Sequence, residues 1–132
     1  MHTERFDVRS RTHSQMIEIT DRVAEAVRNA KLANGLVTVY VPHTTAGVTI
    51  NENADPSVVH DVLAALDRAV PWRQDFYQHD EGNSAAHVKA SMMGFSVSIP
   101  VIDARMALGT WQAVYFCEFD GPRTRSVIVV CS

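Results

Sequence analysis

The chain has 132 residues, of which 46% are hydrophobic and 20% charged, and its formal net charge at pH 7 is -3. This length suits one independently folding unit, so we expect residues 1–132 to form a single domain around a sizeable core. The charge supplies no field that would hold a nucleic-acid backbone or an anionic membrane. Neither a signal peptide nor a run of about 18 apolar residues is present, which predicts a cytoplasmic protein with no membrane partner.

The N-terminal third is predicted to contain strands and one helix. Loosely alternating apolar residues before Thr20 indicate two short strands, or a strand and a turn. Thr20 is a suitable N-cap, and apolar residues recur at helical spacing from Asp21 until Asn34-Gly35 ends the helix. Residues 36–41 are rich in β-branched side chains and predict a strand, which Pro42 stops.

The middle of the chain is predicted to contain a second strand, two helices and a long loop. Residues 46–50 resume extended character, and Asp55-Pro56 is a typical N-cap and first position of a helix that ends before Pro71. Residues 72–82 lose periodicity and predict a surface loop of a length often kept for function. Residues 84–93 then predict a third, shorter helix, ended by Gly94.

The remainder is predicted to be mainly strands, over residues 95–102, 106–108, 111–119 and 126–131, with a turn at Asp120-Gly121-Pro122. Strands outnumber helices and come partly in adjacent pairs. This order favours an α+β fold with a mostly antiparallel sheet and about three helices covering one face.

Three histidines lie in polar segments where chemistry is expected. His43 follows a strand end, His79 lies in the long loop, and His87 lies one turn into the third helix. They are suited to converge on one cation, with Asp80 or Asn83 fixing an imidazole tautomer. The alternative for His43 is a surface side chain bonded to Thr44 or Thr45.

Two further clusters carry polar groups near strand ends. Glu52 could ligate a metal or transfer a proton, and Asn51 could orient Glu52 or donate to a substrate oxygen. Alternatively, both residues could belong to the polar entry of the second helix. Trp111 and Gln112 could wall a pocket for a flat heterocycle, although tryptophan in a strand is usually core. Glu118 either faces solvent by strand alternation or points into a cavity with a raised pKa.

Three basic residues are candidates for holding phosphate groups. Arg123 and Arg125 lie on either side of Thr124, just after the Gly121-Pro122 turn, and Lys89 lies close to His87 on the third helix. A planar guanidinium can bind two phosphate oxygens at once. Both arginines could equally be ordinary solvated turn residues.

Three separated motifs together resemble the YjbQ-like family, from about Thr20 to the C-terminus. They are VPHTTAGVTINENADPSVVHD, GNSAAHVKASMMG and LGTWQAVYFCEFDGPRTR. The resemblance implies a barrel-like or sandwiched antiparallel core and a homotrimer. The sequence departs from the family pattern at Asp103-Ala104-Arg105, where alanine stands in place of an expected glycine. This difference puts the local turn in doubt.

The resemblance also implies a site. His43, His79 and His87 would hold a divalent metal at one pocket, with zinc favoured by three imidazoles and an open fourth position. The site would also include the residues named above as candidates: Asn51, Glu52, Asn83, Trp111, Gln112 and Glu118.

The activity that the family implies is that of a secondary thiamine-phosphate synthase. Such an enzyme couples a hydroxymethylpyrimidine diphosphate to a thiazole phosphate, with loss of diphosphate. Lys89, Arg123 and Arg125 would neutralise the diphosphate, while Trp111 and Glu118 would steady the pyrimidine.

Two other functions stay open. Diphosphate departure is usually assisted by magnesium, whereas three histidines suit zinc. This mismatch favours a zinc-dependent hydrolase with Glu52 or Glu118 as base. A non-catalytic trimer that binds a small ligand or a metal as a sensor is the third interpretation.

Overall fold

A computed structural model describes all 132 residues as one α+β unit. The strands are β1 (His2–Arg9), β2 (Gln15–Glu18), β3 (Gly35–Tyr40), β4 (Ala46–Glu52), β5 (Ser96–Ile102), β6 (Arg105–Met106), β7 (Gln112–Glu118) and β8 (Thr124–Cys131). The helices are α1 (Thr20–Ala30), α2 (Pro56–Ala69) and α3 (Ser84–Met93). None of the three helices combines the length and apolar character that crossing a bilayer requires.

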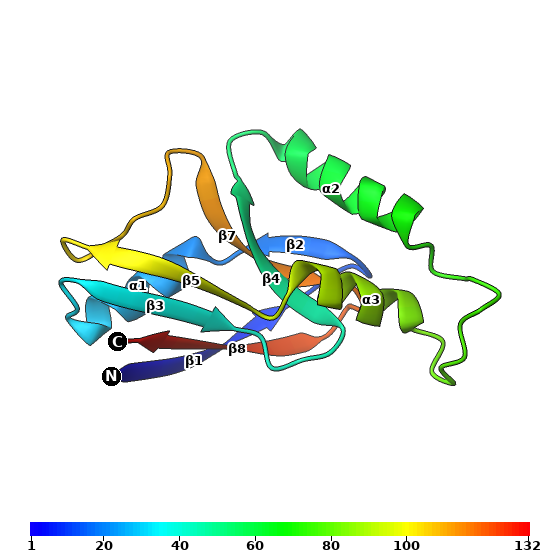
Figure 1. The fold of residues 1–132 in the computed structure, drawn as a ribbon, viewed down its shortest axis with the longest axis horizontal. Helices are drawn as coiled ribbons and strands as arrows, with labels where there is room; N and C mark the ends of the chain where they lie inside the picture. The colour runs from blue at the N-terminus through cyan, green and yellow to red at the C-terminus, as the bar shows by residue number, and fades with distance from the viewer.

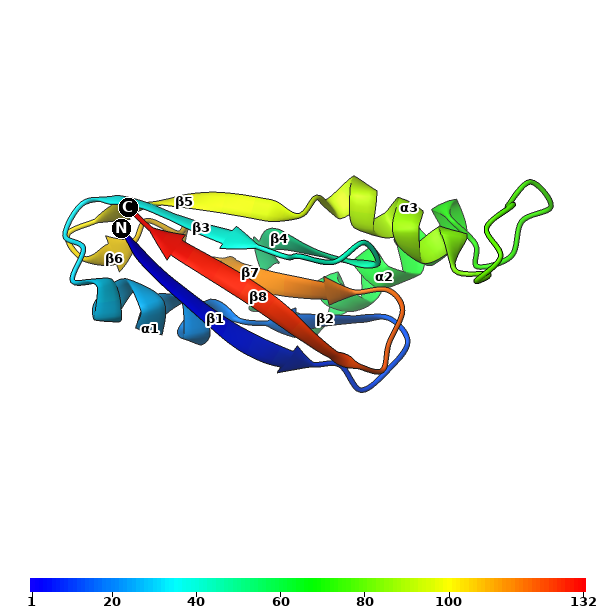
Figure 2. The ribbon, with the colours of Figure 1, turned by 90° about the horizontal axis from the view of Figure 1, so that it is seen from below.

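Every strand pairing in the protein is antiparallel, and the strands form two sheets. The larger sheet has the order β1-β8-β3-β5-β6, and the smaller has the order β2-β7-β4. The larger sheet curls around the smaller one, which gives a barrel-like core (Figures 1 and 2). The fold class predicted from the sequence is therefore confirmed.

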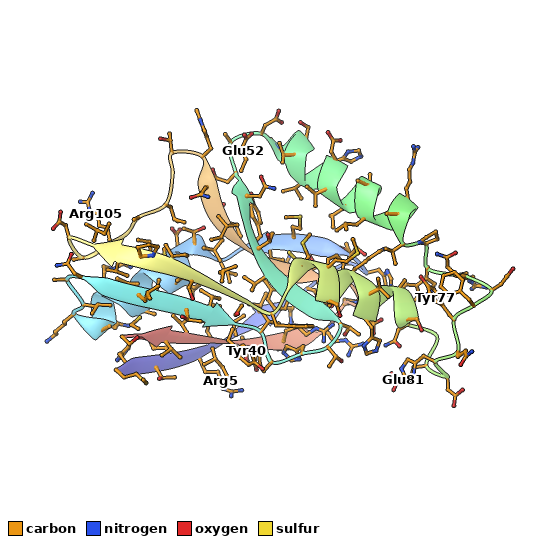
Figure 3. The ribbon with its side chains drawn as sticks, viewed as in Figure 1. Arg5, Tyr40, Glu52, Tyr77, Glu81 and Arg105 are labelled. Atoms are coloured by element: carbon orange, nitrogen blue, oxygen red, sulfur yellow. The ribbon has the colours of Figure 1, made fainter.

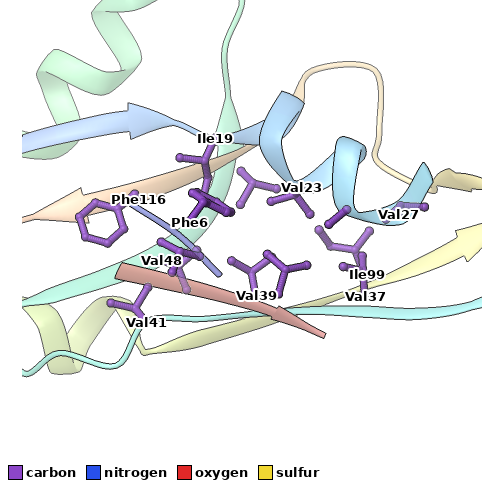
Figure 4. Packing of buried hydrophobic residues seen from close by; sticks show 14 of the residues in the cluster. Phe6, Ile19, Val23, Val27, Val37, Val39, Val41, Val48, Ile99 and Phe116 are labelled. Atoms are coloured by element: carbon purple, nitrogen blue, oxygen red, sulfur yellow. The ribbon is translucent and has the colours of Figure 1, made fainter. Parts of the chain in front are cut away.

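The main core lies between the two sheets and beneath α1 (Figure 4). Val39 and Phe6 of the larger sheet, Val48 and Phe116 of the smaller one, and Val23 of α1 all belong to this cluster. β-branched side chains fill most of it, as expected for strands whose inner faces are both covered. This core holds β3, β4, β7 and β8 in a fixed register.

A second core covers the other face of the smaller sheet. Tyr115 and Cys117 of β7 pack there against α3, which contributes Ala86 and Ala90. α2 packs through half-buried residues such as Leu63, and none of its side chains is fully buried. The two helices thus lie on one side of the smaller sheet (Figure 1). Because α1 packs on the main core instead, the prediction that the helices cover one face is wrong.

Most predicted elements are confirmed, and the start of the first helix is the main exception. Asp55 caps α2 as predicted, because its carboxylate accepts a hydrogen bond from the Ser57 N–H at 2.9 Å. Thr20 does not cap α1: it is the first helical residue, and its hydroxyl accepts from the Val114 N–H of β7 at 2.9 Å. The helix also ends earlier than predicted, at Lys31 in a left-handed conformation.

The turn between β7 and β8 packs closely against the segment that follows β1. A Cβ added at Gly121 would lie 2.5 Å from the Thr12 carbonyl oxygen and 2.6 Å from the Ser10 Oγ, so only glycine fits. The Gly121 N–H donates to the His13 carbonyl at 3.0 Å. This contact fixes the position of Asp120 and Arg123, which frame the candidate site.

Candidate functional site

A polar cavity of about 450 Å³ lies where the loop after β3, the start of α3 and the β7–β8 turn meet. None of its lining residues is Ala, Val, Leu, Ile, Met, Phe or Trp. The lining consists of Pro42, His43, Thr44, Thr45, His79, Glu81, Asn83, His87, Asp120, Arg123 and Arg125. Such a lining suits a small, charged, strongly hydrated ligand rather than an apolar one.

The three predicted histidines all line this cavity. His79 and His87 lie close together, with ring centres 5.2 Å apart and planes at 85°. His43 lies on the opposite wall, where its Nε2 accepts a hydrogen bond from the Ser126 N–H of β8 at 2.9 Å. The structure thus brings the three side chains to one cavity, in two groups.

His43 is held as a neutral imidazole. Burial, followed by the neighbouring Arg125 guanidinium, lowers its pKa below the ordinary value. Because Nε2 accepts the Ser126 N–H, the ring proton sits on Nδ1. His43 therefore offers one N–H donor and has no free lone pair.

A three-histidine metal centre does not fit this arrangement. Two imidazoles on one tetrahedral zinc have ring centres about 5 Å apart, given Zn–N bonds of about 2 Å, and the His79–His87 separation agrees with that value. His43 cannot be the third ligand while its Nε2 is bonded to Ser126. No group of three His, Cys, Asp or Glu side chains has a metal-holding arrangement in the structure.

A buried ion pair adjoins the cavity: Arg125 lines it, and its partner Glu118 does not. Glu118 is fully buried and Arg125 is 4% exposed. Glu118 accepts from the Arg125 Nε at 2.9 Å, the Ser10 Oγ at 2.8 Å and the Asp120 N–H at 3.0 Å, and also from the Arg125 Nη2. Arg125 Nη2 also donates to the Thr45 Oγ1 at 2.8 Å.

The ion pair changes the role expected of Glu118. Burial alone would raise its pKa, but the hydrogen bonds from Arg125, the Asp120 N–H and Ser10 outweigh that effect and hold the pKa below its ordinary value. A solvent-facing Glu118 and a Glu118 with a raised pKa are therefore both wrong. With four donors around an ionised carboxylate, it has no acceptor site left for a substrate proton.

Arg123 and Arg125 present different groups to the cavity. Arg123 is exposed, and its Nε and Nη2 bind the carbonyl and carboxylate of Asp120 at 2.9 and 3.2 Å. The Nη1 of Arg125 makes no hydrogen bond within the protein, although its Nε and Nη2 do. Together with the His43 Nδ1–H, these groups can donate to a bound anion.

Asn83 is positioned by the same turn. It lies just before α3, and its Nδ2 donates to the Asp120 Oδ2 at 2.9 Å, so it does not cap the helix. Its Oδ1 is buried without a partner. The sequence interpretation missed Asp120, which binds both Asn83 and Arg123, because it was assigned only to a turn. Its position beside a strand end and two arginines was the available signal.

Four predicted site residues lie elsewhere. In the β4–β7 pair Ala46 is opposite Glu118 and Glu52 is opposite Gln112, so Glu52 is six residues, about 20 Å, from the cavity end of its strand. Asn51 and Trp111 lie at the same far end, and Trp111 is 62% exposed. Figure 3 shows Glu52 near the start of α2, away from Glu81.

Lys89 is also outside the cavity. It is 4% exposed, and its Nζ donates to the Asp67 carboxylate of α2 at 3.2 Å. Its apolar stem fills the space between α2 and α3 while its charge is paired. The residue is therefore a link between helices, and the prediction that it binds the substrate's phosphate groups is wrong for this arrangement.

The fold and the cavity define a class of small α+β proteins with a polar pocket, lined by histidines, arginines and carboxylates, at one end of paired antiparallel sheets. A family model described as UPF0047 protein YjbQ-like matches residues 4–132, so the chain belongs to that family. It is 46% identical to the UPF0047 protein YugU of Bacillus subtilis over 124 residues, 94% of each chain. It is 44% identical to the UPF0047 protein MJ1081 of Methanocaldococcus jannaschii, covering 95% of this chain and 90% of that one.

Solved structures agree with this membership. An uncharacterised conserved protein of the YjbQ/UPF0047 family from Clostridium acetobutylicum superposes with a TM-score of 0.96 at 47% identity, covering 98% of this chain and 99% of that one. The hypothetical protein APE1520 from Aeropyrum pernix gives a TM-score of 0.94 at 36% identity, covering 100% and 98%.

Proposed function

We propose that the chain is a transferase that acts on small phosphorylated molecules bound in the polar cavity. The observation that carries this proposal is the set of converging donors: the Arg123 guanidinium, the free Nη1 of Arg125 and the Nδ1–H of His43, in a cavity with no apolar lining. The two guanidiniums are charged donors, which bind phosphate oxygens about twice as strongly as neutral donors such as the His43 N–H do.

The reaction we propose is the thiamine-phosphate synthase reaction that the family resemblance implies. The thiazole nitrogen forms a bond to the pyrimidinylmethyl carbon, and the carbon–oxygen bond to the diphosphate breaks with the electron pair leaving on oxygen. Arg123 and Arg125 stabilise the charge that develops on the diphosphate, and the His43 N–H donates to one of its oxygens. The reaction balances without a proton transfer, so no general base is required.

The test is direct synthesis of thiamine phosphate from hydroxymethylpyrimidine diphosphate and thiazole phosphate. We expect the wild-type protein to form the product and Arg123→Gln to lower kcat/KM at least tenfold, because one charged hydrogen bond contributes about 1.5–3 kcal/mol. Arg73→Gln, which changes an exposed arginine outside the cavity, is the matched control. Absence of product, or equal rates for Arg123→Gln and the control, contradicts the proposal.

Growth of a thiamine-requiring strain gives an independent test in cells. His43→Ala and His87→Ala are expected to rescue growth less well than the wild type, whereas Glu52→Gln, at the far end of β4, is expected to rescue fully. If both histidine variants rescue as well as the wild type, the cavity is not the site of this activity. The proposal includes a homotrimer in the cytoplasm, which light scattering and cell fractionation test.

A metal-dependent hydrolase is the second candidate, and the His79–His87 separation of 5.2 Å favours it. Metal analysis of the purified protein, with a panel of phosphate esters, separates the two candidates. A stoichiometric metal that is lost in the His79→Ala variant, together with ester turnover, supports the hydrolase. Phosphate binding without any turnover supports a non-catalytic ligand-binding protein.

A further inference from the structure

A second cavity, of about 430 Å³, lies at the opposite end of the molecule from the polar one. It separates α1 from the hairpin formed by β5 and β6, and Figure 3 shows Arg105 of this hairpin far from Glu81. Its floor is apolar: Ala24 and Val27 of α1 face Met106 of β6. Leu108 closes one side. The volume falls in the range of sites for small molecules.

Two arginines stand at this cavity without acidic partners. Arg28 comes from the last turn of α1 and Arg105 from β6, and both are exposed. The ion pairs that lysine and arginine form in this protein join Lys89 to Asp67, Arg123 to Asp120 and Arg125 to Glu118. No carboxylate lines the second cavity. It therefore combines an apolar surface with two unpaired positive charges.

The hairpin tip that shapes the cavity has an unfavourable backbone conformation. Ala104 has φ of 65° and Asp103 has φ of 51°, a region that residues other than glycine rarely adopt. Hydrogen bonds fasten the tip to the turn after α1: the Ala104 N–H donates to the Ala33 carbonyl at 2.8 Å. The alanine thus keeps its methyl group at the cavity wall at a cost in conformational energy. Both values fit a two-residue type I′ turn, which joins β5 to β6 and so places Arg105 at the cavity.

We propose that this cavity is a binding site for a small anion with an apolar body, that is, an aliphatic or aromatic carboxylate or phosphate monoester. The apolar body contacts Val27, Met106 and Leu108, and the anionic head lies between Arg28 and Arg105. The two guanidiniums can replace hydrogen bonds to water with charged hydrogen bonds to the oxygens of the head group. The apolar wall beside them contacts the body of the ligand. The fastened hairpin sets the position of the Arg105 backbone relative to α1 before the ligand arrives.

The experiment is an NMR titration of the full chain with octanoate, octyl phosphate, octanol and acetate. We expect octanoate and octyl phosphate to shift amide resonances of α1 and of residues 103–108, with at least tenfold weaker binding of octanol, which lacks the charge, and of acetate, which lacks the apolar body. The ratio between octanoate and octyl phosphate identifies the preferred head group. Shifts that map elsewhere, or equal affinity for octanoate and octanol, overturn the proposal.

Variants separate the charge from the cavity. Arg28→Gln combined with Arg105→Gln should weaken octanoate binding at least tenfold and leave octanol unchanged. Arg68→Gln combined with Arg73→Gln, which removes the same charge from exposed positions elsewhere, should leave octanoate binding unchanged. Ala24→Leu fills the floor while keeping helical propensity, and it should weaken both ligands together. Equal losses of octanoate affinity in the two double arginine variants would show a nonspecific charge effect and overturn the proposal.

Discussion

The two walls of the polar cavity are built in different ways. The strand wall consists of His43, Thr45 and Arg125, backed by the buried Glu118, and these side chains are hydrogen-bonded to one another or to the backbone of β8. The loop wall consists of His79, Glu81 and His87, and the side chains of His79 and Glu81 are 44% and 73% exposed. The comparison shows a preorganised surface facing an adaptable one.

This difference fits the proposed chemistry. Groups that stabilise developing charge act best when they need not reorganise during the reaction, and the strand wall holds its donors in that way. A loop wall can move to admit two substrates and release a product.

Glu118→Gln should destabilise the protein by about 3 kcal/mol, because it leaves the buried Arg125 guanidinium without a counter-charge. Urea denaturation at pH 7.5 measures the change. Glu118→Gln combined with Arg125→Met should recover part of the loss, since it removes the unpaired charge. A loss below about 0.5 kcal/mol for the single variant would show that the strand wall is not held by this pair.

Thr45→Val should cost about 1.5 kcal/mol, because it removes the acceptor of a charged hydrogen bond while keeping the shape of the side chain. Thr44→Val is the control: Thr44 is exposed and its side chain forms no hydrogen bond, so the change should lie within about 0.5 kcal/mol. Equal effects at the two positions, measured by the same denaturation series, would remove the distinction between buried and exposed threonines.

How far the sequence predicted these walls depends on the residue. The helices α2 and α3, and the gathering of His43, His79 and His87, follow from capping signals, from spacing and from the family resemblance. The sequence does not predict the burial of Glu118, because β7 is covered on both faces and so shows no polar alternation. The sequence does not predict the separation of Glu52 from the histidines either, since only the β4–β7 register shows which strand end each residue occupies.

The pH dependence of stability should reveal His43. Its folded-state pKa is lowered by burial and by Arg125, so the unfolded chain binds more protons as pH falls below about 6.5. Stability contributed by the neutral ring is present above that pH and decreases as the pH falls toward the folded-state pKa. His43→Gln should flatten this part of the curve of unfolding free energy against pH. An unchanged slope between pH 7.5 and 5.5 would contradict the buried neutral imidazole.

His79→Ala combined with His87→Ala should have the smallest effect on stability, within about 0.5 kcal/mol, because neither ring forms a hydrogen bond with the strand wall. Calorimetry compares the double variant with the wild type. A loss as large as that of Thr45→Val would mean that the loop wall is as firmly packed as the strand wall, and the contrast between them would disappear.

The pairing of β1 with β8 has a consequence for protein engineering. His2 is opposite Cys131, and the two chain ends lie side by side (Figures 1 and 2). A short glycine-rich linker can therefore join them, and new ends can be opened in the exposed part of the loop between α2 and α3. Such a circular permutant would keep both sheets intact while placing a fusion partner or a fluorescent reporter directly beside the polar cavity.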